Sequence, residues 1–386
     1  MIEPDEPSCP NRLTIGIETR SLVPILSGGI VNTQIGVFQE VFARYRQHRY
    51  LVFCLPFNRR LFEGWGDHVE LVEFPLATYF DQLERWLAAD PVEILFRAYP
   101  GRPLAACPAA RQIVYMPDNQ HDFLPGLFDP DTLEFRRLAF GDALARAGAI
   151  ATISEFSRAT LAAQAPRGRD IFLMPPALQR AHEAAGQAPL DPAEAPLVPS
   201  EPFFYYPANL WPHKNHDRIL AGFRAFTRMA SRRFCFVLTG DRSPWPAREA
   251  AFADLDVRHL GFVSPTLVNA LMRRAEALVF FSLFEGFGAP LLEAFHAGTP
   301  VLCSPVASLP EIAGDAALMA DPTDSLAMAA AMRRITADPA LRATLIARGR
   351  ARLSAYSWAR SAATLIQACA RVAARARDET ASAAAS

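Results

Sequence analysis

The stretch that decides the fold is residues 280–318, FFSLFEGFGAPLLEAFHAGTPVLCSPVASLPEIAGDAAL. It opens with an apolar run that is typical of a buried strand, and a loop with Gly286 and Gly288 follows. Pro290 then begins a helix that Gly298 ends, because proline is favoured in the first helical turn and glycine just past the last one. A second apolar run, PVLCS, comes next. Strand, loop, helix and strand in this order are the repeating unit of a parallel α/β sheet.

The same alternation runs through the N-terminal half of the chain. Its apolar runs are continuous, which is typical of strands buried on both faces of a parallel sheet. Segments of helical period lie between them at 32–46, 79–89 and 132–147. We therefore predict a doubly wound α/β domain. The predicted strands are LTIGIET (13–19), YLVFCL (50–55), VELVEF (69–74), VEILFRAY (92–99), RQIVYM (111–116) and AIATIS (149–154).

A change of composition separates this domain from a second one. Residues 181–201 are rich in proline and alanine and have no periodicity, which indicates a linker. Strand and helix patterns then resume with FFYYPA. Two Rossmann-like domains that face a central cleft are predicted, with ligands bound at the carboxyl ends of the strands. The predicted divisions are a domain over 1–180, the linker over 181–201, a second domain over 202–355, and a last helix with a frayed tail over 356–386.

Composition and charge exclude several classes of protein. The 39 basic and 40 acidic side chains give a formal net charge of −1, so we expect no nucleic-acid partner and only local recognition of a small phosphate-bearing ligand. The N-terminus lacks a signal-peptide pattern, and no run approaches the roughly 18 apolar residues of a membrane span, so a cytoplasmic protein is predicted. Dispersed cysteines without a Cys-x-x-Cys pair predict buried, reduced thiols at Cys9, Cys54, Cys107, Cys235, Cys303 and Cys369.

The loop ahead of Pro290 is a predicted anion site. Its glycines leave backbone N–H groups accessible at the positive end of the following helix, where phosphate groups bind readily. Glu285 lies in the loop, and Glu293 lies on the helix. Two carboxylates beside a phosphate site are suited to accept hydrogen bonds from sugar hydroxyls on either side of a diphosphate.

This pattern resembles glycosyltransferase family 4, the group 1 glycosyl transferases of the GT-B fold. The resemblance rests on Glu-Gly-Phe-Gly-x-Pro-x-x-Glu-Ala, followed by Gly-x-Pro-Val and Pro-Glu-x-x-Gly-Asp. It implies that a sugar is transferred with retention from a nucleoside diphosphate, UDP- or GDP-linked, to an acceptor hydroxyl, with no cofactor and no metal ion. It also implies that Glu285 contacts the donor sugar and Glu293 the ribose. Further contacts to sugar and phosphate are implied for Gly286, Phe287, Gly288 and Ala289.

A second motif, WPHKNHDRIL (211–220), places Lys214 at the start of a helix, where its charge is suited to neutralise a diphosphate leaving group. The resemblance implies the same role, because PHKNH is similar to the family's phosphate-binding lysine motif. The chain departs from the family at Ala208, where many members have an arginine. Asn209, which follows it, is a further candidate donor contact. Arg242 in LTGDRS is the candidate replacement for the missing charge.

The nucleobase pocket is implied at the turn after HLGF. Ser264 and Pro265 predict the start of a helix there, as N-cap and first helical residue. By resemblance, Phe262 and Val263 line the base. A plain core role fits these two residues as well.

In the N-terminal half, VYMPDNQHDF (114–123) follows a predicted strand and breaks at Pro117. This places His121 in a loop at the edge of the sheet that faces the cleft. By resemblance His121 lies near the donor sugar, with Asp118 behind it, and we include His121 with Glu285 and Lys214 as candidate catalytic residues.

Two further elements resemble parts of the family's fold. Gly28 and Gly29 in SGGIVNTQIG (27–36) resemble a first-loop contact to phosphate and acceptor, although any tight turn also uses glycines. The last helix, which begins at YSW (356–358), is implied to return to the N-terminal acceptor domain, with Trp358 packing there.

Two Asp-x-Asp sequences, DPD (129–131) and DLD (254–256), match the metal motif of a different glycosyltransferase fold. Neither follows a strand as that motif requires. Asp129 is instead predicted to cap the next helix. No metal ligand is therefore predicted.

The acceptor is implied to be a saccharide or a lipid-linked saccharide in polysaccharide assembly. Cations mixed with aromatic residues at 43–50 and 58–66 predict either a solvated helix face or a face that touches an anionic membrane. Two alternative functions stay open. One is another enzyme of this architecture, such as an epimerase or a sugar phosphorylase, and the other is a nucleotide-sugar-binding protein without transfer activity.

Overall fold

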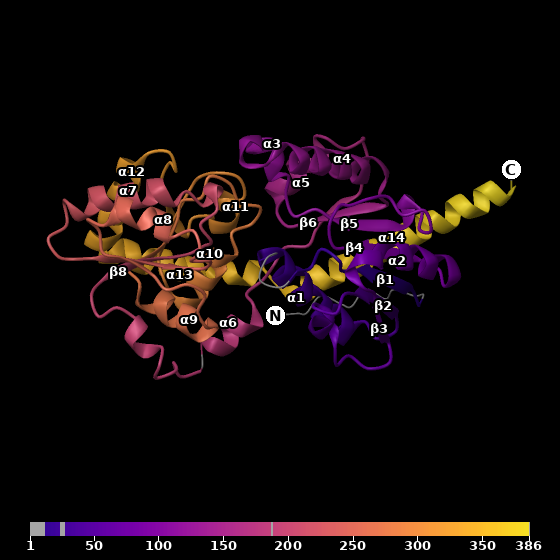
Figure 1. Ribbon diagram of the computed structural model, residues 1–386, viewed down its shortest axis with the longest axis horizontal. Helices are drawn as coiled ribbons and strands as arrows, with labels where there is room; N and C mark the ends of the chain where they lie inside the picture. The colour runs from indigo at the N-terminus through magenta and orange to yellow at the C-terminus, as the bar shows by residue number, and fades with distance from the viewer. Residues whose placement is uncertain (1–11, 24–27, 187, 386) are drawn as a thin grey trace. The chain divides into compact units, whose positions relative to one another are not determined.

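A computed structural model describes residues 12–23, 28–186 and 188–385 of the chain (Figure 1). The chain divides into two compact units. The first, here the N-terminal unit, runs to Pro176 and includes the segment from Ser357 onward. The second, the C-terminal unit, runs from Ala177 to Tyr356.

The N-terminal unit is built on a seven-stranded sheet in the order β3-β2-β1-β4-β5-β6-β7, with parallel pairing throughout. Helices connect the strands, as a parallel sheet requires. The strands are β1 Thr14–Glu18, β2 Arg49–Cys54, β3 Val69–Glu73, β4 Ile94–Arg97, β5 Gln112–Tyr115, β6 Ala149–Thr152 and β7 Ile171–Leu173. The helices are α1 Gly28–Arg44, α2 Tyr79–Ala89, α3 Gln120–Phe123, α4 Pro130–Arg146, α5 Glu155–Ala162 and α14 Trp358–Ala385.

The C-terminal unit is built on a six-stranded parallel sheet in the order β10-β9-β8-β11-β12-β13. The strands are β8 Phe203–Pro207, β9 Cys235–Thr239, β10 Val257–His259, β11 Ala277–Phe280, β12 Val301–Cys303 and β13 Ala317–Met319. The helices are α6 Arg180–Ala185, α7 His216–Thr227, α8 Pro246–Glu249, α9 Pro265–Arg274, α10 Ala289–Ala297, α11 Leu309–Ala313, α12 Ser325–Ala337 and α13 Pro339–Arg352.

The continuous apolar runs form the central strands, because helices cover both faces of each sheet. Every residue of β4, β5, β6, β9 and β11 is buried. The prediction of two doubly wound α/β domains is confirmed. The thiols predicted to be buried and unpaired are so at Cys54, Cys107, Cys235, Cys303 and Cys369, whereas Cys9 lies outside the described residues.

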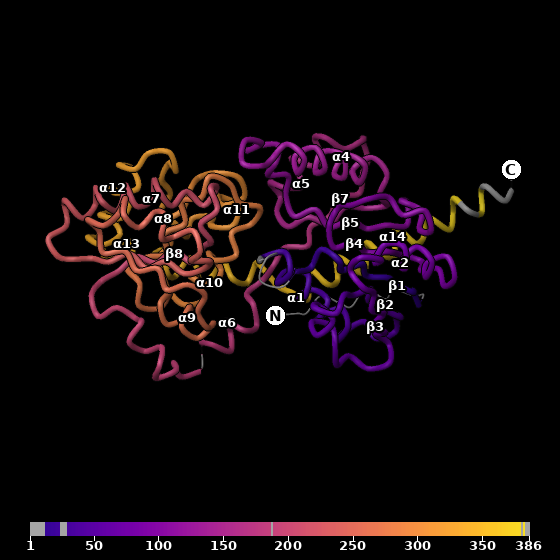
Figure 2. Tube along the Cα trace, viewed as in Figure 1, coloured from indigo at the N-terminus to yellow at the C-terminus, as the bar shows by residue number. Residues whose placement is uncertain are grey.

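The last helix belongs to the N-terminal unit, as the resemblance implies. The trace in Figure 2 shows α14, in yellow, beside the indigo α1, and the two helices are in contact. Trp358 packs against Gly36 of α1 so closely that a Cβ at Gly36 would lie 2.8 Å from the indole ring. The predicted packing role of Trp358 is thereby confirmed. The frayed tail is a correction, because α14 continues to Ala385.

The segment expected to be a linker is also a correction. Residues 180–185 form α6, and a short 3₁₀ turn spans Ala195–Leu197. The whole of 181–201 lies within the C-terminal unit. Helix α6 is only six residues long, which is too short for a helical period to be recognised in a segment rich in proline and alanine.

The aromatic residues at 43–50 and 58–66 do not form a surface. Tyr45, Tyr50 and Phe62 are buried, and the Tyr50 ring packs edge-on against Phe42 with 5.0 Å between ring centroids. Three of the four aromatic side chains in these stretches therefore supply core packing, and the fourth, Trp65, is partly buried. Within the described residues, no helix combines the length and the apolar character that a bilayer span needs.

Candidate active site

The candidate site lies at the carboxyl edge of the C-terminal sheet. All its strands are parallel, so the loops that follow them emerge on the same edge. The chain order reverses between β8 and β11, and such a switch point is where α/β sheets bind ligands. The loop after β8 leads to Lys214, and the loop after β11 leads to Glu285.

Lys214 and Glu285 meet at this switch point. The Lys214 Nζ lies 2.7 Å from the Glu285 Oε1, and the two side chains are only 14% and 11% exposed. The same Nζ lies 5.4 Å from the centroid of the Phe280 ring. Lys214 is the only lysine in the sequence, although the chain has 39 basic residues. The structure thus brings two of the three predicted catalytic residues into contact.

A buried tyrosine joins the two loops from below. The Tyr206 hydroxyl donates a hydrogen bond to the Lys214 carbonyl at 2.9 Å and lies 3.1 Å from the Ser282 Oγ. Burial raises the pKa of Tyr206 far above its usual value, so the hydroxyl stays protonated. The backbone N–H of Leu283 also donates to the His213 carbonyl at 2.8 Å. The position of Lys214 relative to Glu285 is therefore fixed by the protein.

Asn215, next to Lys214, has a left-handed backbone conformation with φ +63°. Its Nδ2 donates to the carbonyls of Phe281 and Pro322 at 3.0 and 2.7 Å. Asparagine tolerates this conformation better than most side chains. The sequence analysis missed Asn215, although an asparagine directly before a helix is a usable signal for such a turn.

The glycine-containing loop offers unused backbone donors. Gly288 has φ +98°, and a Cβ there would lie 2.7 Å from the Leu309 Cδ2, so the position requires glycine. No side chain caps the N-terminus of α10. Within the described part of the chain, the amides of residues 286–289 donate to no protein acceptor. Successive free amides at a helix N-terminus form an anion-binding cradle.

Ser308 holds this loop in place. Its Oγ lies 2.8 Å from the Glu285 carbonyl and 3.0 Å from the Phe287 carbonyl. Ala307 beside it has φ +50°, an unusual conformation for a non-glycine residue. The Phe287 side chain is buried and packs edge-on against Tyr356, with ring centroids 5.2 Å apart. Phe287 therefore presents its backbone, not its ring, to the loop.

Glu293 lies on α10 and pairs with a residue that the sequence analysis missed. Its Oε1 lies 3.4 Å from the Nε2 of His182 on α6, and each side chain is 14% exposed. Burial raises the pKa of the Glu293 carboxyl, and the charge of His182 opposes that rise. His182 and Glu293 are far apart in the sequence and meet only in the folded protein. The sequence analysis predicted a linker where α6 and His182 lie, so it gave no sign of this contact.

The predicted nucleobase turn follows β10, which ends at His259. Phe262 is 63% exposed in this turn, so a core role is wrong for its side chain, and Val263 is partly buried. Ser264 caps α9 as predicted, since its Oγ accepts a hydrogen bond from the Leu267 N–H at 3.0 Å.

Asn209 and Arg242 lie on neighbouring loops of the same edge. The Asn209 Oδ1 accepts a hydrogen bond from the Asp241 N–H at 2.8 Å, which joins the loop after β8 to the loop after β9. The Arg242 side chain is exposed on the second of these loops. Ala208 is buried. A positive side chain is thus present on this edge but not at position 208.

Two histidines beside Lys214 are held neutral by burial. The pKa of His213 falls to about 4, chiefly through desolvation and secondly through the charge of Lys214. The pKa of His216 falls to about 3, again chiefly through desolvation. The His216 ring packs against Tyr206 with 4.8 Å between centroids. Both are therefore uncharged neighbours of the lysine at neutral pH.

The N-terminal unit holds the remaining predicted residues, and the placement of His121 in a loop is a correction. It lies in the short helix α3, not in a loop, and only 2% of it is exposed. Its ring packs against Phe140 at 4.7 Å, and burial lowers its pKa. Its Nδ1 has no hydrogen-bond partner among the described residues. Asp118 accepts a hydrogen bond from the Gln120 N–H at 2.9 Å, so it shapes the start of α3.

Gly28 and Gly29 begin α1. A Cβ at Gly29 would meet nothing within 4 Å, so packing does not require glycine there. The Gly29 carbonyl accepts a hydrogen bond from the Thr33 hydroxyl at 2.7 Å.

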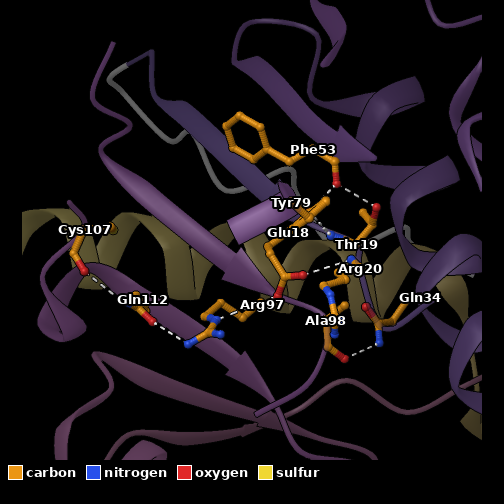
Figure 3. A network of polar contacts seen from close by, with 10 residues as sticks. All are labelled: Glu18, Thr19, Arg20, Gln34, Phe53, Tyr79, Arg97, Ala98, Cys107 and Gln112. Carbon is orange, nitrogen blue, oxygen red and sulfur yellow. Dashed lines mark hydrogen bonds and ion pairs between the residues drawn. The ribbon is translucent and has the colours of Figure 1, made fainter. Parts of the chain in front are cut away.

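A polar network underlies the carboxyl ends of β1 and β4 in this unit (Figure 3). The buried Glu18 and Arg97 face each other at 3.8 Å, and Glu18 also accepts from the Arg20 N–H at 2.9 Å. Gln34 donates to the Ala98 carbonyl at 2.8 Å, which ties α1 to the segment after β4. Burial raises the pKa of Glu18 against the charge of Arg97. The network fixes the sheet edge from which α1 starts.

Asp129 and Asp256, from the two Asp-x-Asp sequences, each contact other residues of the protein. Asp129 caps α4, as predicted, by accepting from the Thr132 N–H at 2.8 Å. Potential ligand atoms of Glu201, Cys235 and Asp256 lie within 4.8 Å of one another, a cluster that the sequence analysis missed. The Arg258 guanidinium contacts both carboxylates. Both carboxylates of this cluster therefore already share a cationic partner.

Two doubly wound units, with an anion cradle and a lysine–carboxylate pair at a switch point, define the class of two-domain GT-B proteins. Solved structures agree: WaaG, a glycosyltransferase of lipopolysaccharide biosynthesis, has a TM-score of 0.67 at 17% identity over 92% of this chain and 99% of its own. Anabaena Alr3699/HepE in complex with UDP and glucose has a TM-score of 0.69 at 15% identity over 92% and 99%. These likenesses concern the fold.

Sequence comparison finds related proteins. Residues 189–352 match the family model described as glycosyl transferases group 1. The O-antigen chain mannosyltransferase B of Escherichia coli is 29% identical over 245 residues, 61% of this chain. The match spans 63% of that relative's length.

Proposed function

We propose that the protein transfers a sugar from a nucleoside diphosphate sugar to an acceptor hydroxyl, with retention of the anomeric configuration and without a metal ion. The observation that carries the proposal is the Lys214–Glu285 pair beside the free amides of residues 286–289. A cation next to an anion cradle is suited to hold a leaving diphosphate. A carboxylate beside both is suited to accept hydrogen bonds from the donor sugar.

Catalysis then rests on stabilising the charge of the leaving group. Lys214 and the loop amides supply the positive charge that a metal ion supplies elsewhere, and they are held in place before the donor arrives. In a same-face reaction the leaving diphosphate oxygen takes the proton of the incoming hydroxyl. Glu293 holds the ribose, and the turn at Phe262 and Val263 lines the base.

Relatives guide the choice of substrate. Because the similar Escherichia coli protein is named an O-antigen chain mannosyltransferase, we propose a hexose donor, with mannose first, and a saccharide or lipid-linked saccharide acceptor. The donor nucleotide is proposed to be UDP or GDP. Contact with the cytoplasmic face of a membrane is proposed only as a consequence of a lipid-linked acceptor.

The test measures release of nucleoside diphosphate from GDP-mannose and UDP-glucose, with and without alkyl mannoside acceptors and with EDTA present. We expect release from one donor to rise when the acceptor is added, EDTA to have no effect, and the product anomer seen by NMR to match the donor. Inversion of the anomer or loss of activity in EDTA would contradict the mechanism. Absence of acceptor-dependent release with every donor would contradict the function.

A further inference from the structure

His182 lies on α6, in the segment that sequence analysis predicts to be a linker. Its Nε2 is 3.4 Å from the Glu293 Oε1. Helix α6 contacts α9, and a Cβ at Gly186, just past α6, would lie 3.2 Å from the Nε2 of His296 on α10. Helix α6 is therefore packed beside the helix that carries Glu293, and the His182 side chain is only 14% exposed there.

The same segment is attached at a second polar point. The Ser264 Oγ donates to the Glu194 Oε2 at 2.6 Å, and the Ser264 N–H lies 3.4 Å from the Glu194 Oε1. Ser264 ends the turn that is proposed to line the nucleobase. His182 and Glu194 therefore both adjoin residues that are proposed to bind the nucleoside.

We propose that His182 is a positioning residue of the donor site, which keeps the Glu293 carboxylate ionised and oriented to accept hydrogen bonds from the ribose hydroxyls of a nucleoside diphosphate. This inference rests on the proposed function, in which Glu293 binds the ribose. In metal sites, mutation of a residue that orients a metal ligand typically lowers metal affinity about 10- to 100-fold. His182 would orient Glu293 in the same way.

The charges around Glu293 support this role. Burial raises the pKa of Glu293, and His182 is the group that opposes the rise. Tyr205 faces Glu293 from β8, but its hydroxyl lies 2.7 Å from the Thr239 Oγ1 and its pKa is raised, chiefly by burial, so it stays neutral. His296 adjoins α6 from the same helix as Glu293. Without His182, the carboxyl would protonate at a higher pH, and a protonated carboxyl accepts fewer hydrogen bonds.

The test is calorimetric titration of the full chain with UDP and GDP, and with the 2′,3′-dideoxy analogue of each, between pH 5.5 and 8.5. The variants are His182→Ala, His182→Gln and the control Glu183→Gln, whose side chain is exposed on the same helix. Thermal melts report whether each variant is folded. His182→Gln keeps a hydrogen-bond donor but has no charge. It can be compared with the wild type if His182→Ala does not fold.

We expect His182→Ala to weaken binding of the ribonucleotide roughly 10-fold at pH 7, the lower end of the effect known for residues that orient a ligand-binding group, and to move the acidic limit of binding to higher pH. His182→Ala should bind the dideoxy analogue as tightly as wild type does. The control Glu183→Gln should bind the ribonucleotide as tightly as wild type does. His182→Gln should approach wild-type affinity only at the alkaline end. Equal losses for ribose and dideoxy ligands, or an unchanged acidic limit, would overturn the inference. Wild-type protein that binds neither UDP nor GDP would instead refute the proposed function, and this inference with it.

Discussion

At the scale of single residues, the account depends on one ion pair. Lys214 and Glu285 come from loops 71 residues apart, and their contact at 2.7 Å leaves both side chains mostly buried. Each therefore compensates the charge of the other while no donor is bound. A diphosphate adds negative charge beside Lys214, which gives the lysine a second partner and leaves Glu285 available to sugar hydroxyls.

Lys214→Ala and Glu285→Ala should each lower kcat/KM by roughly 100-fold or more, the usual cost of removing one transition-state charge contact. Lys214→Arg should recover only part of the activity, because a guanidinium differs from an ammonium in shape and hydrogen-bond geometry. Steady-state kinetics with parallel thermal melts check this. Wild-type turnover by the two alanine variants would refute the assignment.

Single residues also show where sequence analysis stops. The anion cradle was predicted from the motif around Glu285 and Glu293, because the spacing of its glycines, proline and carboxylates can be read within one short stretch of sequence. His182 and Ser308 carry no such local pattern, and they matter only because the fold brings them to Glu293 and to the Glu285 carbonyl. His121 looked like a loop residue, yet one helical turn and the packing of Phe140 bury it.

At the scale of elements, the strands were predictable and the short helices were not. A continuous apolar run such as 277–282 has few alternatives to a buried strand, and β11 is found there. Helix α6 is too short for a periodic signal, and proline-rich neighbours conceal it. The chain turns just after β10, where Gly261 has φ +76°.

The loop before α10 gives a prediction about backbone geometry. Gly288→Ala should destabilise the protein by more than about 1 kcal/mol and weaken nucleotide binding, because φ is positive and the added Cβ would meet Leu309. The matched control is Gly141→Ala in α4, where a Cβ meets nothing within 4 Å and alanine should stabilise the helix by roughly 0.5–1 kcal/mol. Urea denaturation measures both. Similar effects of the two substitutions would contradict the strained-loop account.

The buried histidines predict a dependence of stability on pH. His213 and His216 have pKa values of about 4 and about 3 when folded, below the ordinary value of 6.5. The unfolded chain therefore binds more protons below pH 6.5, and the free energy of unfolding falls as the pH drops from there toward the folded values. Between pH 7.5 and pH 5.5, each of the two histidines should lower the free energy of unfolding by about 1.4 kcal/mol. Urea denaturation at pH 7.5 and 5.5 measures the loss, and His216→Gln should reduce it; an unchanged slope would contradict the assignment.

At the scale of the whole molecule, the chain passes between the units twice, after Pro176 and again before Ser357. The second passage brings α14 back to the N-terminal unit, where Trp358 packs on Gly36. The family resemblance implied this return. The residues YSW alone do not show which part of the protein Trp358 packs against. After the first passage come His182 and Glu194, which contact Glu293 and Ser264 of the proposed nucleoside site.

The most direct test of the donor site uses the single lysine of the chain. Protein labelled with ¹³C at lysine Cε gives one NMR signal for the Lys214 side chain, which is followed during titration with UDP- and GDP-linked sugars. The account predicts that the signal shifts to saturation with one nucleotide series, that the free sugar leaves it unchanged, and that Glu293→Ala weakens the response. A lysine signal that stays in place while calorimetry shows the nucleotide sugar to be bound would place the donor elsewhere and contradict the assignment of the donor site to Lys214 and Glu285.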